Sequence, residues 1–246
     1  MNISANTLFH FTREYDTLVK ILETKFYPRL CLEQNLLFKN KSNNSWAIPM
    51  VCFCDIPLSQ ISEHTSKYGN YAIGIKKDWA KSQGVSPIIY VHENSLVSKT
   101  IIEDALNMID ELEKDDNIKR RLVKYFDVIT MMKQYEGFDL KTKKVIRYYD
   151  EREWRYVPPR EDDDSLNIFL KTEYDDVDEK GKIDKHNEKY GVSFNPDNIN
   201  YIIVDKEDEV LKIKKVINDI KGDFSHKSVE LLTTRILSME RIREDM

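Results

Sequence analysis

Two acidic side chains at alternate positions, Glu151 and Glu153, lie in the aromatic-rich segment YYDEREWRYV (residues 148–157). Side chains alternate between the faces of a strand, so a strand here would place both glutamates beside Tyr149 and Arg155. Two carboxylates on one face repel, and this repulsion is expected to raise the pKa of at least one of them. A carboxylate beside aromatic walls suits a pocket that stacks a flat ring. The alternative is a solvated sheet face on which glutamates and arginines pair.

A second group of candidate residues lies near the start of the chain. The segment LFHFT (residues 8–12) predicts a short strand with His10 and Thr12 on one face. These two polar side chains either look at solvent from a half-buried strand or hold a ligand in a cleft. Tyr68 and Tyr71 flank a Gly-Asn turn, where they either pack on the sheet or clamp a planar ligand.

The elements that must position these residues follow from the spacing of the apolar side chains. Apolar residues at helical spacing predict two antiparallel helices within 95–135 and further helices within 206–246. Residues 25–47 are expected to be irregular, and residues 174–190 to form a solvated loop. Short apolar segments predict strands within residues 8–12, 50–57, 71–80, 88–91, 144–159 and 199–205.

This order of elements predicts an α+β fold. A chain of 246 residues is long enough to bury a sizeable core. We expect one domain over residues 1–246, with a helical insertion at 95–135 and a C-terminal helical extension at 206–246.

The composition excludes several classes of function. The net charge of −5 and the isoelectric point near 5.7 give no global electrostatic reason for binding nucleic acid or an anionic membrane. No segment approaches the ~20 apolar residues that cross a bilayer, and no secretion signal is recognised. The cysteines, Cys31, Cys52 and Cys54, fit neither a disulfide framework nor a zinc site. We therefore expect a cytoplasmic protein without a metal ion or a membrane partner.

Five segments together carry a resemblance to a known family. They are LFHFT, VCFCDIPLS, HTSKYGNYAIGIKKDWA, PIIYV and EREWRY, in this order along the chain. This layout resembles the AbiGi family of bacterial abortive-infection proteins over about the first two thirds of the sequence. The resemblance implies a role in phage resistance, in which members are labelled the antitoxin half of a toxin–antitoxin pair.

The same layout is similar to the ADP-ribosyltransferase superfamily, in which a histidine on the first strand precedes aromatic residues and a late-strand glutamate. This resemblance implies a split mixed or antiparallel sheet and NAD as a substrate. It implies that His10 hydrogen-bonds the adenosine ribose of NAD and that Thr12 supports it. Tyr68 and Tyr71 match the aromatic residues that sandwich the nicotinamide, at a much shorter spacing than in that superfamily.

The resemblance also implies catalytic roles for the two glutamates. Glu153 matches the late-strand glutamate, and Glu151 resembles the first carboxylate of a Glu-x-Glu pair. Cleavage of the nicotinamide–ribose bond passes through an oxocarbenium-like state, so a carboxylate beside the ribose would stabilise the developing positive charge. The second carboxylate would deprotonate the incoming nucleophile.

Two functions from different classes follow. The first is an NAD-dependent ADP-ribosyltransferase of phage defence that modifies a protein or nucleic-acid target. The second is a catalytically silent antitoxin or sensor that binds a cognate toxin or a phage protein. In that case the segment 95–135 and the acidic loops would be the contact surfaces. Other enzymes, including an NAD hydrolase or a nuclease, form a third group.

Overall fold

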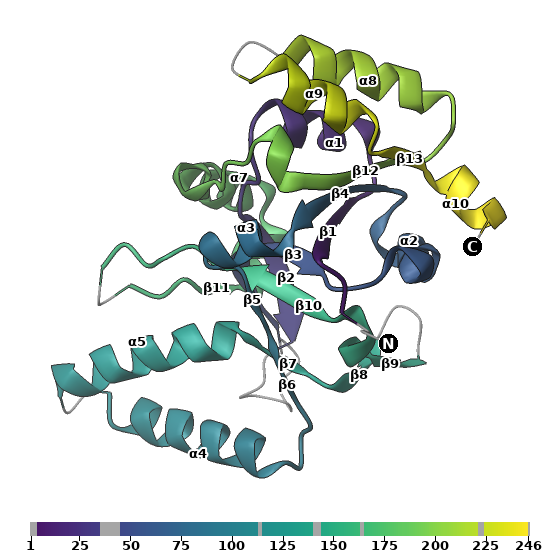
Figure 1. The fold of residues 1–246 in the computed structure, drawn as a ribbon. Helices are drawn as coiled ribbons and strands as arrows, with labels where there is room; N and C mark the ends of the chain where they lie inside the picture. Colours follow the sequence, from purple (N-terminus) through teal and green to yellow (C-terminus); the bar gives the residue numbers. More distant parts are fainter. Residues whose placement is uncertain are drawn as a thin grey trace. The chain divides into compact units, whose positions relative to one another are not determined.

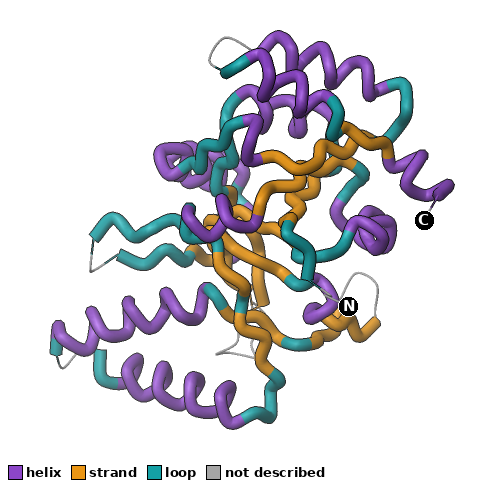
Figure 2. Tube along the Cα trace, in the orientation of Figure 1, coloured by secondary structure: helices purple, strands orange, loops and turns teal. Residues whose placement is uncertain are grey.

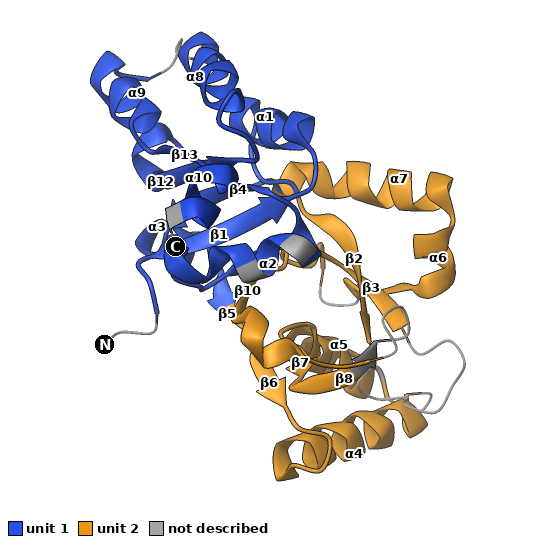
Figure 3. Cartoon of the chain, turned by 90° about the vertical axis from the view of Figure 1, so that its right-hand side faces the viewer, with its two compact units in different colours: residues 1–27, 52–86, 191–246 blue, residues 28–51, 87–190 orange. Residues whose placement is uncertain are grey.

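The computed structural model of the protein describes residues 4–34, 45–112, 115–139, 144–162, 165–220 and 224–245 (Figure 1). The chain divides into two compact units (Figure 3): unit 1 comprises residues 1–27, 52–86 and 191–246, and unit 2 comprises residues 28–51 and 87–190. The chain forms both helices and strands, as Figure 2 shows, so the predicted α+β class is confirmed. A single domain over residues 1–246 and a sheet of the ADP-ribosyltransferase type stay predictions.

A mixed sheet runs through unit 1. Its strands are β1 (Thr7–Thr12), β4 (Tyr71–Lys76), β12 (Ile199–Val204) and β13 (Ile236–Ser238), in the spatial order β13-β12-β4-β1. Strand β4 is antiparallel to both β1 and β12, whereas β12 and β13 are parallel. The end of β3 (Ser45–Cys54) continues the sheet beside β1, where Phe9 lies opposite Cys54. Strands β1, β4 and β12 are rich in β-branched and aromatic residues, which pack well on a pleated surface.

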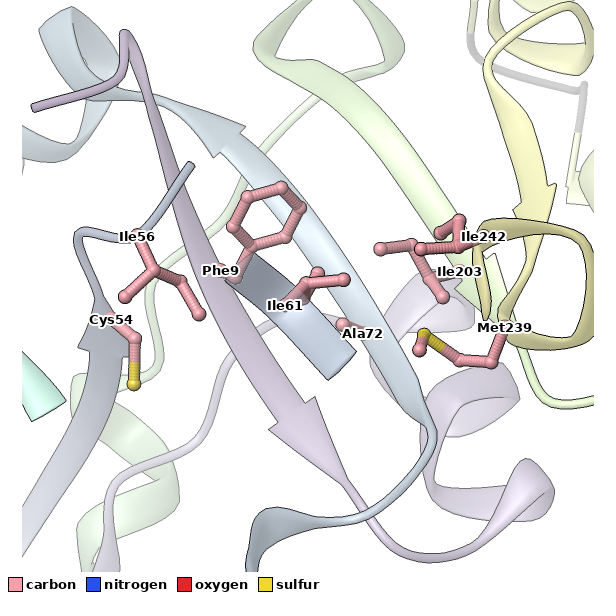
Figure 4. Close-up of a cluster of buried hydrophobic side chains, with 8 residues drawn as sticks. All are labelled: Phe9, Cys54, Ile56, Ile61, Ala72, Ile203, Met239 and Ile242. Carbon is pink, nitrogen blue, oxygen red and sulfur yellow. The ribbon is translucent and has the colours of Figure 1, made fainter. Parts of the chain in front are cut away.

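Helices of unit 1 share a core with this sheet. Figure 4 shows Phe9, Ala72 and Ile203 of the strands together with Ile61 and Met239 of two helices. Because strands and helices bury their apolar side chains in one cluster, burial of that surface holds these elements together. The helices of this unit are α1 (Tyr15–Glu23), α2 (Ile61–Tyr68), α3 (Lys77–Ser82), α8 (Glu209–Asp219), α9 (His226–Thr233) and α10 (Met239–Asp245).

A strand lies inside the segment 206–246, which was predicted to be helical. Helix α8 is observed, but the residues that follow form α9, β13 and α10. Strand β13 pairs in parallel with β12, with Ile236 opposite Ile202. A short apolar run fits a helix or a strand equally well. Here the run forms a strand, because the edge of β12 is available to form hydrogen bonds with the backbone groups of β13.

Unit 2 contains short strands in several pairs. Strands β2 (Arg29–Gln34) and β11 (Phe169–Leu170) both pair antiparallel with β3. Strand β6 (Ile89–Val91) pairs in parallel with β7 (Met132–Gln134). Strand β8 (Glu136–Asp139) pairs antiparallel with β9 (Lys144–Arg147). Two further strands are β5 (Ser86–Pro87) and β10 (Glu153–Tyr156). The prediction that residues 25–47 are irregular is therefore wrong for β2 and the start of β3, and residues 35–44 lie outside the described residues.

The helices of unit 2 are α4 (Leu96–Asp110), α5 (Asp116–Thr130), α6 (Lys171–Asp175) and α7 (Val177–Asn187). In chain order, α4 and α5 lie between β6 and β7, where the apolar spacing predicts helices. In the described part of the chain, no helix has the length and apolar character needed to cross a membrane.

Helix α7 corrects the prediction of a solvated loop at 174–190. Asp176 caps it by accepting hydrogen bonds from the backbone N–H groups of Asp178 and Glu179. Along the helix, Lys180 Nζ lies 3.0 Å from Asp184 Oδ2, and Asp184 Oδ1 also accepts a 2.7 Å hydrogen bond from the N–H of Leu30. Capping and charged contacts stabilise this helix in place of a wide apolar face.

Candidate functional site

Lys133 of β7 lies at the centre of a cluster of buried charged side chains in unit 2. Its Nζ donates hydrogen bonds to Glu151 Oε2 at 2.8 Å and to Glu153 Oε2 at 2.9 Å. The same Nζ is 3.9 Å from Oε1 of Glu33 on β2. One ammonium group therefore joins three carboxylates from two separate parts of the chain, residue 33 and residues 151–153.

Arg155 is the second cation of the cluster, and its side chain is 0% exposed. Its Nε donates to Glu153 Oε1 at 2.5 Å, and its Nη2 lies 3.0 Å from Glu33 Oε2. Its Nη1 donates to the carbonyl oxygen of Thr130 at 2.9 Å. The cluster thus contains three carboxylates and two cations, so it carries one excess negative charge when all are ionised.

Both cations determine the ionisation of Glu153. Burial by itself raises the pKa of a carboxyl group, but the charges and hydrogen bonds of Lys133 and Arg155 outweigh it and lower the pKa of Glu153 to about 2. Burial opposes the charge on Lys133 as well, yet the three surrounding carboxylates hold its pKa well above the ordinary value. The repulsion expected between the two glutamates therefore does not raise the pKa of Glu153, because Lys133 and Arg155 both contact its carboxylate.

Glu151 does not lie on a strand, so the alternation of side chains between the two faces of a strand does not explain how it reaches the cluster. Residues Tyr148–Glu151 form a short 3₁₀ helix, η2, instead of a strand. Arg152 follows with φ of 43°, a left-handed conformation that turns the chain into β10. The predicted common strand face for Glu151 and Glu153 is therefore wrong, although both side chains reach Lys133. Within β10, Glu153 and Arg155 do share the buried face.

Tyrosine rings lie beside this charge cluster. The hydroxyl of Tyr90 accepts a 2.9 Å hydrogen bond from the N–H of Glu153, and burial raises the pKa of Tyr90. Its ring meets the ring of Tyr149 edge-on, with centroids 5.2 Å apart. Lys133 Nζ lies 5.1 Å from the ring centre of Tyr148. Of this set, Tyr149 is half exposed and gives the cluster an aromatic border toward solvent.

His10 lies in unit 1, in an aromatic environment. Its Nδ1 is 2.8 Å from the carbonyl oxygen of Cys52, so Nδ1 carries the proton and donates it. The imidazole contacts the rings of Phe26 and Phe53 edge-on, at centroid distances of 5.2 and 5.7 Å. Burial lowers the pKa of His10 and outweighs the opposite effect of the Cys52 hydrogen bond, so the ring is neutral at pH 7.

The other predicted cofactor-binding residues also lie in unit 1. Thr12 and Tyr71 are opposite each other in the β1–β4 ladder. The hydroxyl of Tyr71 donates to Glu209 Oε1 at 3.0 Å, and burial together with this carboxylate raises the pKa of Tyr71. Tyr68, at the end of α2, packs its ring 6.5 Å from that of Phe11. The structure thus brings Glu151 and Glu153 together in unit 2, and groups the four other residues in unit 1. Their roles toward NAD stay predictions.

Sequence reasoning missed Lys133 and Glu33 as members of the cluster. Lys133 follows the apolar run VITMM and was assigned to the end of a helix, whereas it lies on β7. Glu33 lies in a segment that was predicted to be irregular. The signal that could have identified Lys133 and Glu33 is a charged side chain next to apolar residues. Within the described ranges, no group of His, Cys, Asp and Glu side chains is arranged to hold a metal ion.

Comparisons with known proteins agree on one family. The family model described as "Putative abortive phage resistance protein AbiGi, antitoxin" matches residues 24–205. The "Abortive phage resistance protein AbiGi" of Lactococcus lactis subsp. cremoris is 27% identical over 248 residues, which cover 90% of this chain and 98% of that protein. No solved structure matches the chain. The matched family region contains every member of the charge cluster, whereas His10 and Thr12 precede it.

Proposed function

We propose that the protein is the antitoxin of a phage-defence pair and that it neutralises a toxin protein by binding it. The proposal starts from the family, because the chain belongs to the AbiGi family of abortive phage resistance proteins. The description of the family as an antitoxin favours a toxin over a phage component or a nucleic acid as the partner. This is the second of the two functions that the sequence suggested. It needs no catalytic residue.

The state of Glu153 is the observation that carries this proposal. A glutamate that acts on NAD must offer its carboxylate to the ribose. Here Oε1 accepts from Arg155 and Oε2 from Lys133, and the residue is only 5% exposed. A substrate would have to displace two charge-assisted hydrogen bonds from a buried group, and such bonds are about twice as strong as neutral ones.

The charge cluster instead supports a structural role. It connects β2, β7 and β10 of unit 2 through side chains that leave few polar atoms unsatisfied. Breaking a buried ion pair by removing one partner costs about 3–5 kcal/mol, because a charge then stays buried without compensation. The cluster therefore defines how these three strands meet, and a rigid unit 2 is a suitable scaffold for a binding surface.

The dose of antitoxin distinguishes binding from enzymatic modification. The experiment titrates the purified chain into a candidate toxin, the product of a neighbouring gene that is toxic when expressed alone, and measures the residual toxin activity. We expect neutralisation to be complete only at about equimolar amounts, and the two proteins to elute together in size-exclusion chromatography.

Two results would contradict the proposal. Neutralisation by substoichiometric amounts that requires added NAD would support the ADP-ribosyltransferase prediction. Absence of both neutralisation and complex formation, with both proteins folded by circular dichroism, would rule out the antitoxin role for this pair.

A further inference from the structure

A groove runs along the helical hairpin formed by α4 and α5, which lie side by side in Figure 1. Its volume is about 480 Å³, and its walls come only from these two helices of unit 2. The lining residues lie within 104–111 and 121–128, so by the 1.5 Å rise per residue each wall extends over roughly 11 Å, about two helical turns. Ala105, Leu122, Phe126 and Ile129 of the hairpin are buried, and none of them lines the groove.

The two walls of the groove carry opposite charges. Asp104 of α4 and Glu111, the residue that follows α4, line one side, and Arg121 and Lys124 line the other side from α5. All four are exposed. In the part of the chain that the structure describes, the side chains of these four residues form neither an ion pair nor a hydrogen bond.

Exposed charges on other helices behave differently. At the start of α8, Lys212 Nζ pairs with Oδ2 of the N-cap residue Asp208 at 2.9 Å, and in α7 Lys182 pairs with Glu179. Pairs of this kind join exposed charges three or four positions apart on a helix. The groove charges are segregated by helix instead, so each wall presents a single sign of charge to whatever lies between the walls.

Apolar side chains lie between the charged walls. Met108, Tyr125 and Val128 line the groove, and Val128 is 46% exposed. Val97, seven residues before Asp104 and therefore on the same face of α4, is 50% exposed. Apolar side chains that line a groove with charged borders are typical of protein-binding surfaces.

We infer that this groove binds an amphipathic helix of the toxin. The inference rests on the antitoxin function proposed above and names the surface and the chemistry of the partner. A groove between two antiparallel helices accepts a third helix along its length. The bound helix would place an apolar stripe on Met108 and Tyr125, basic residues toward α4 and acidic residues toward α5. This charge pattern selects both the partner and the direction in which its helix lies.

Charge reversal of one wall tests the groove. The experiment measures the Kd of the chain for the same candidate toxin by isothermal titration calorimetry. In the double variant Arg121→Glu/Lys124→Glu, we expect the Kd to rise by about tenfold or more, because like charges then face each other across the groove. The matched control is Lys214→Glu/Lys215→Glu on α8, which makes the same charge change at exposed positions. Its Kd should equal that of the wild type.

A second variant separates the charge pattern from the net charge. Asp104→Lys/Glu111→Lys/Arg121→Glu/Lys124→Glu exchanges the signs of the two walls and leaves the net charge of the chain unchanged. We expect its binding to be weakened at least as much as that of the double variant. Circular dichroism of each variant establishes that α4 and α5 remain folded.

The outcomes separate the inference from the proposed function. Wild-type affinity in both groove variants would overturn the groove and leave the antitoxin function standing. A wild-type chain that does not bind the toxin would overturn both. A wild-type dimer in sedimentation velocity that the groove variants convert to monomers would show that a second copy of the chain occupies the groove, which also overturns the inference.

Discussion

Glu153 and Arg155, two residues apart on β10, form a buried ion pair in which Arg155 Nε lies 2.5 Å from Glu153 Oε1. Neighbours at i and i+2 of a strand point to the same face, and here that face is turned inward. The glutamate that was predicted to act on a substrate therefore has its strongest contact within its own strand. Lys133 and Glu33 complete the arrangement from two other strands.

Removal of Arg155 is expected to destabilise the protein strongly. In Arg155→Met, the carboxylates of Glu33 and Glu153 stay buried with one cation fewer, which should lower the free energy of unfolding by about 3–5 kcal/mol. The control is Arg241→Met, because Arg241 Nη2 forms an exposed pair with Glu207 at 3.7 Å. That change should cost at most about 1 kcal/mol. Urea denaturation measures both, and equal losses in the two variants would contradict the structural role of the cluster.

We expect acid to destabilise unit 2, because it protonates Glu153. Its pKa is lowered from the ordinary 4.5 to about 2 in the folded protein. The unfolded chain therefore binds more protons in this range, so the stabilisation is complete above pH 4.5 and is lost as the pH falls toward 2. Glu153→Gln should have a flatter dependence of the free energy of unfolding on pH. If the free energy of unfolding of Glu153→Gln depends on pH as that of the wild type does between pH 5 and about pH 2.5, the folded protein does not lower the pKa of Glu153.

His10 should contribute a second pH dependence, near neutrality. Burial lowers its pKa from the ordinary 6.5, so the unfolded state binds a proton more readily than the folded state. Its contribution to stability is therefore complete above pH 6.5 and declines as the pH falls. His10→Phe keeps an aromatic ring and removes the titrating group. We expect the fall in stability between about pH 7 and pH 5 to be smaller in this variant, and an equal fall would contradict the burial of a neutral imidazole.

The wild-type chain is expected not to turn over NAD. Both carboxylate oxygens of Glu153 are bound by cations, so the group that would stabilise the oxocarbenium-like state is occupied. The measurement incubates the chain with NAD labelled in the adenine, with and without cell lysate, and follows nicotinamide release and labelled acceptors. Label transfer that disappears in Glu153→Gln, with that variant still folded, would favour the ADP-ribosyltransferase prediction.

Two glycines should respond in opposite directions to alanine. Gly69 has φ of +106°, and an added Cβ would collide with the backbone of Thr12. Gly69→Ala should therefore lower the thermal midpoint of unfolding.

Gly181 lies within α7, and apart from its chain neighbours and the backbone of its own helix no atom lies within 4 Å of the position that a Cβ would take. Gly181→Ala should stabilise the protein by roughly 0.5–1 kcal/mol, because alanine favours the helix. Differential scanning calorimetry distinguishes the two, and destabilisation by Gly181→Ala would contradict helix α7.

The sequence by itself predicted the elements whose evidence is local. Short apolar segments located β1, β4 and β12, and helical spacing located α4, α5 and α8, because burial of apolar side chains leaves a local pattern in the sequence. It also predicted that Glu151 and Glu153 would lie near each other. The resemblance over quoted motifs led to the AbiGi family, which the family match confirms.

Only the tertiary structure decided what surrounds these residues. Lys133 is 18 residues from Glu151 and 20 from Glu153 in the sequence, and Glu33 is still farther away, so no local pattern pairs them. The left-handed Arg152, helix α7 and strand β13 likewise depend on distant partners or on single backbone conformations. Electrostatic interactions act through space, and the same Glu-Arg-Glu triplet would be a solvated face or a buried ion cluster according to which strands pack beside it.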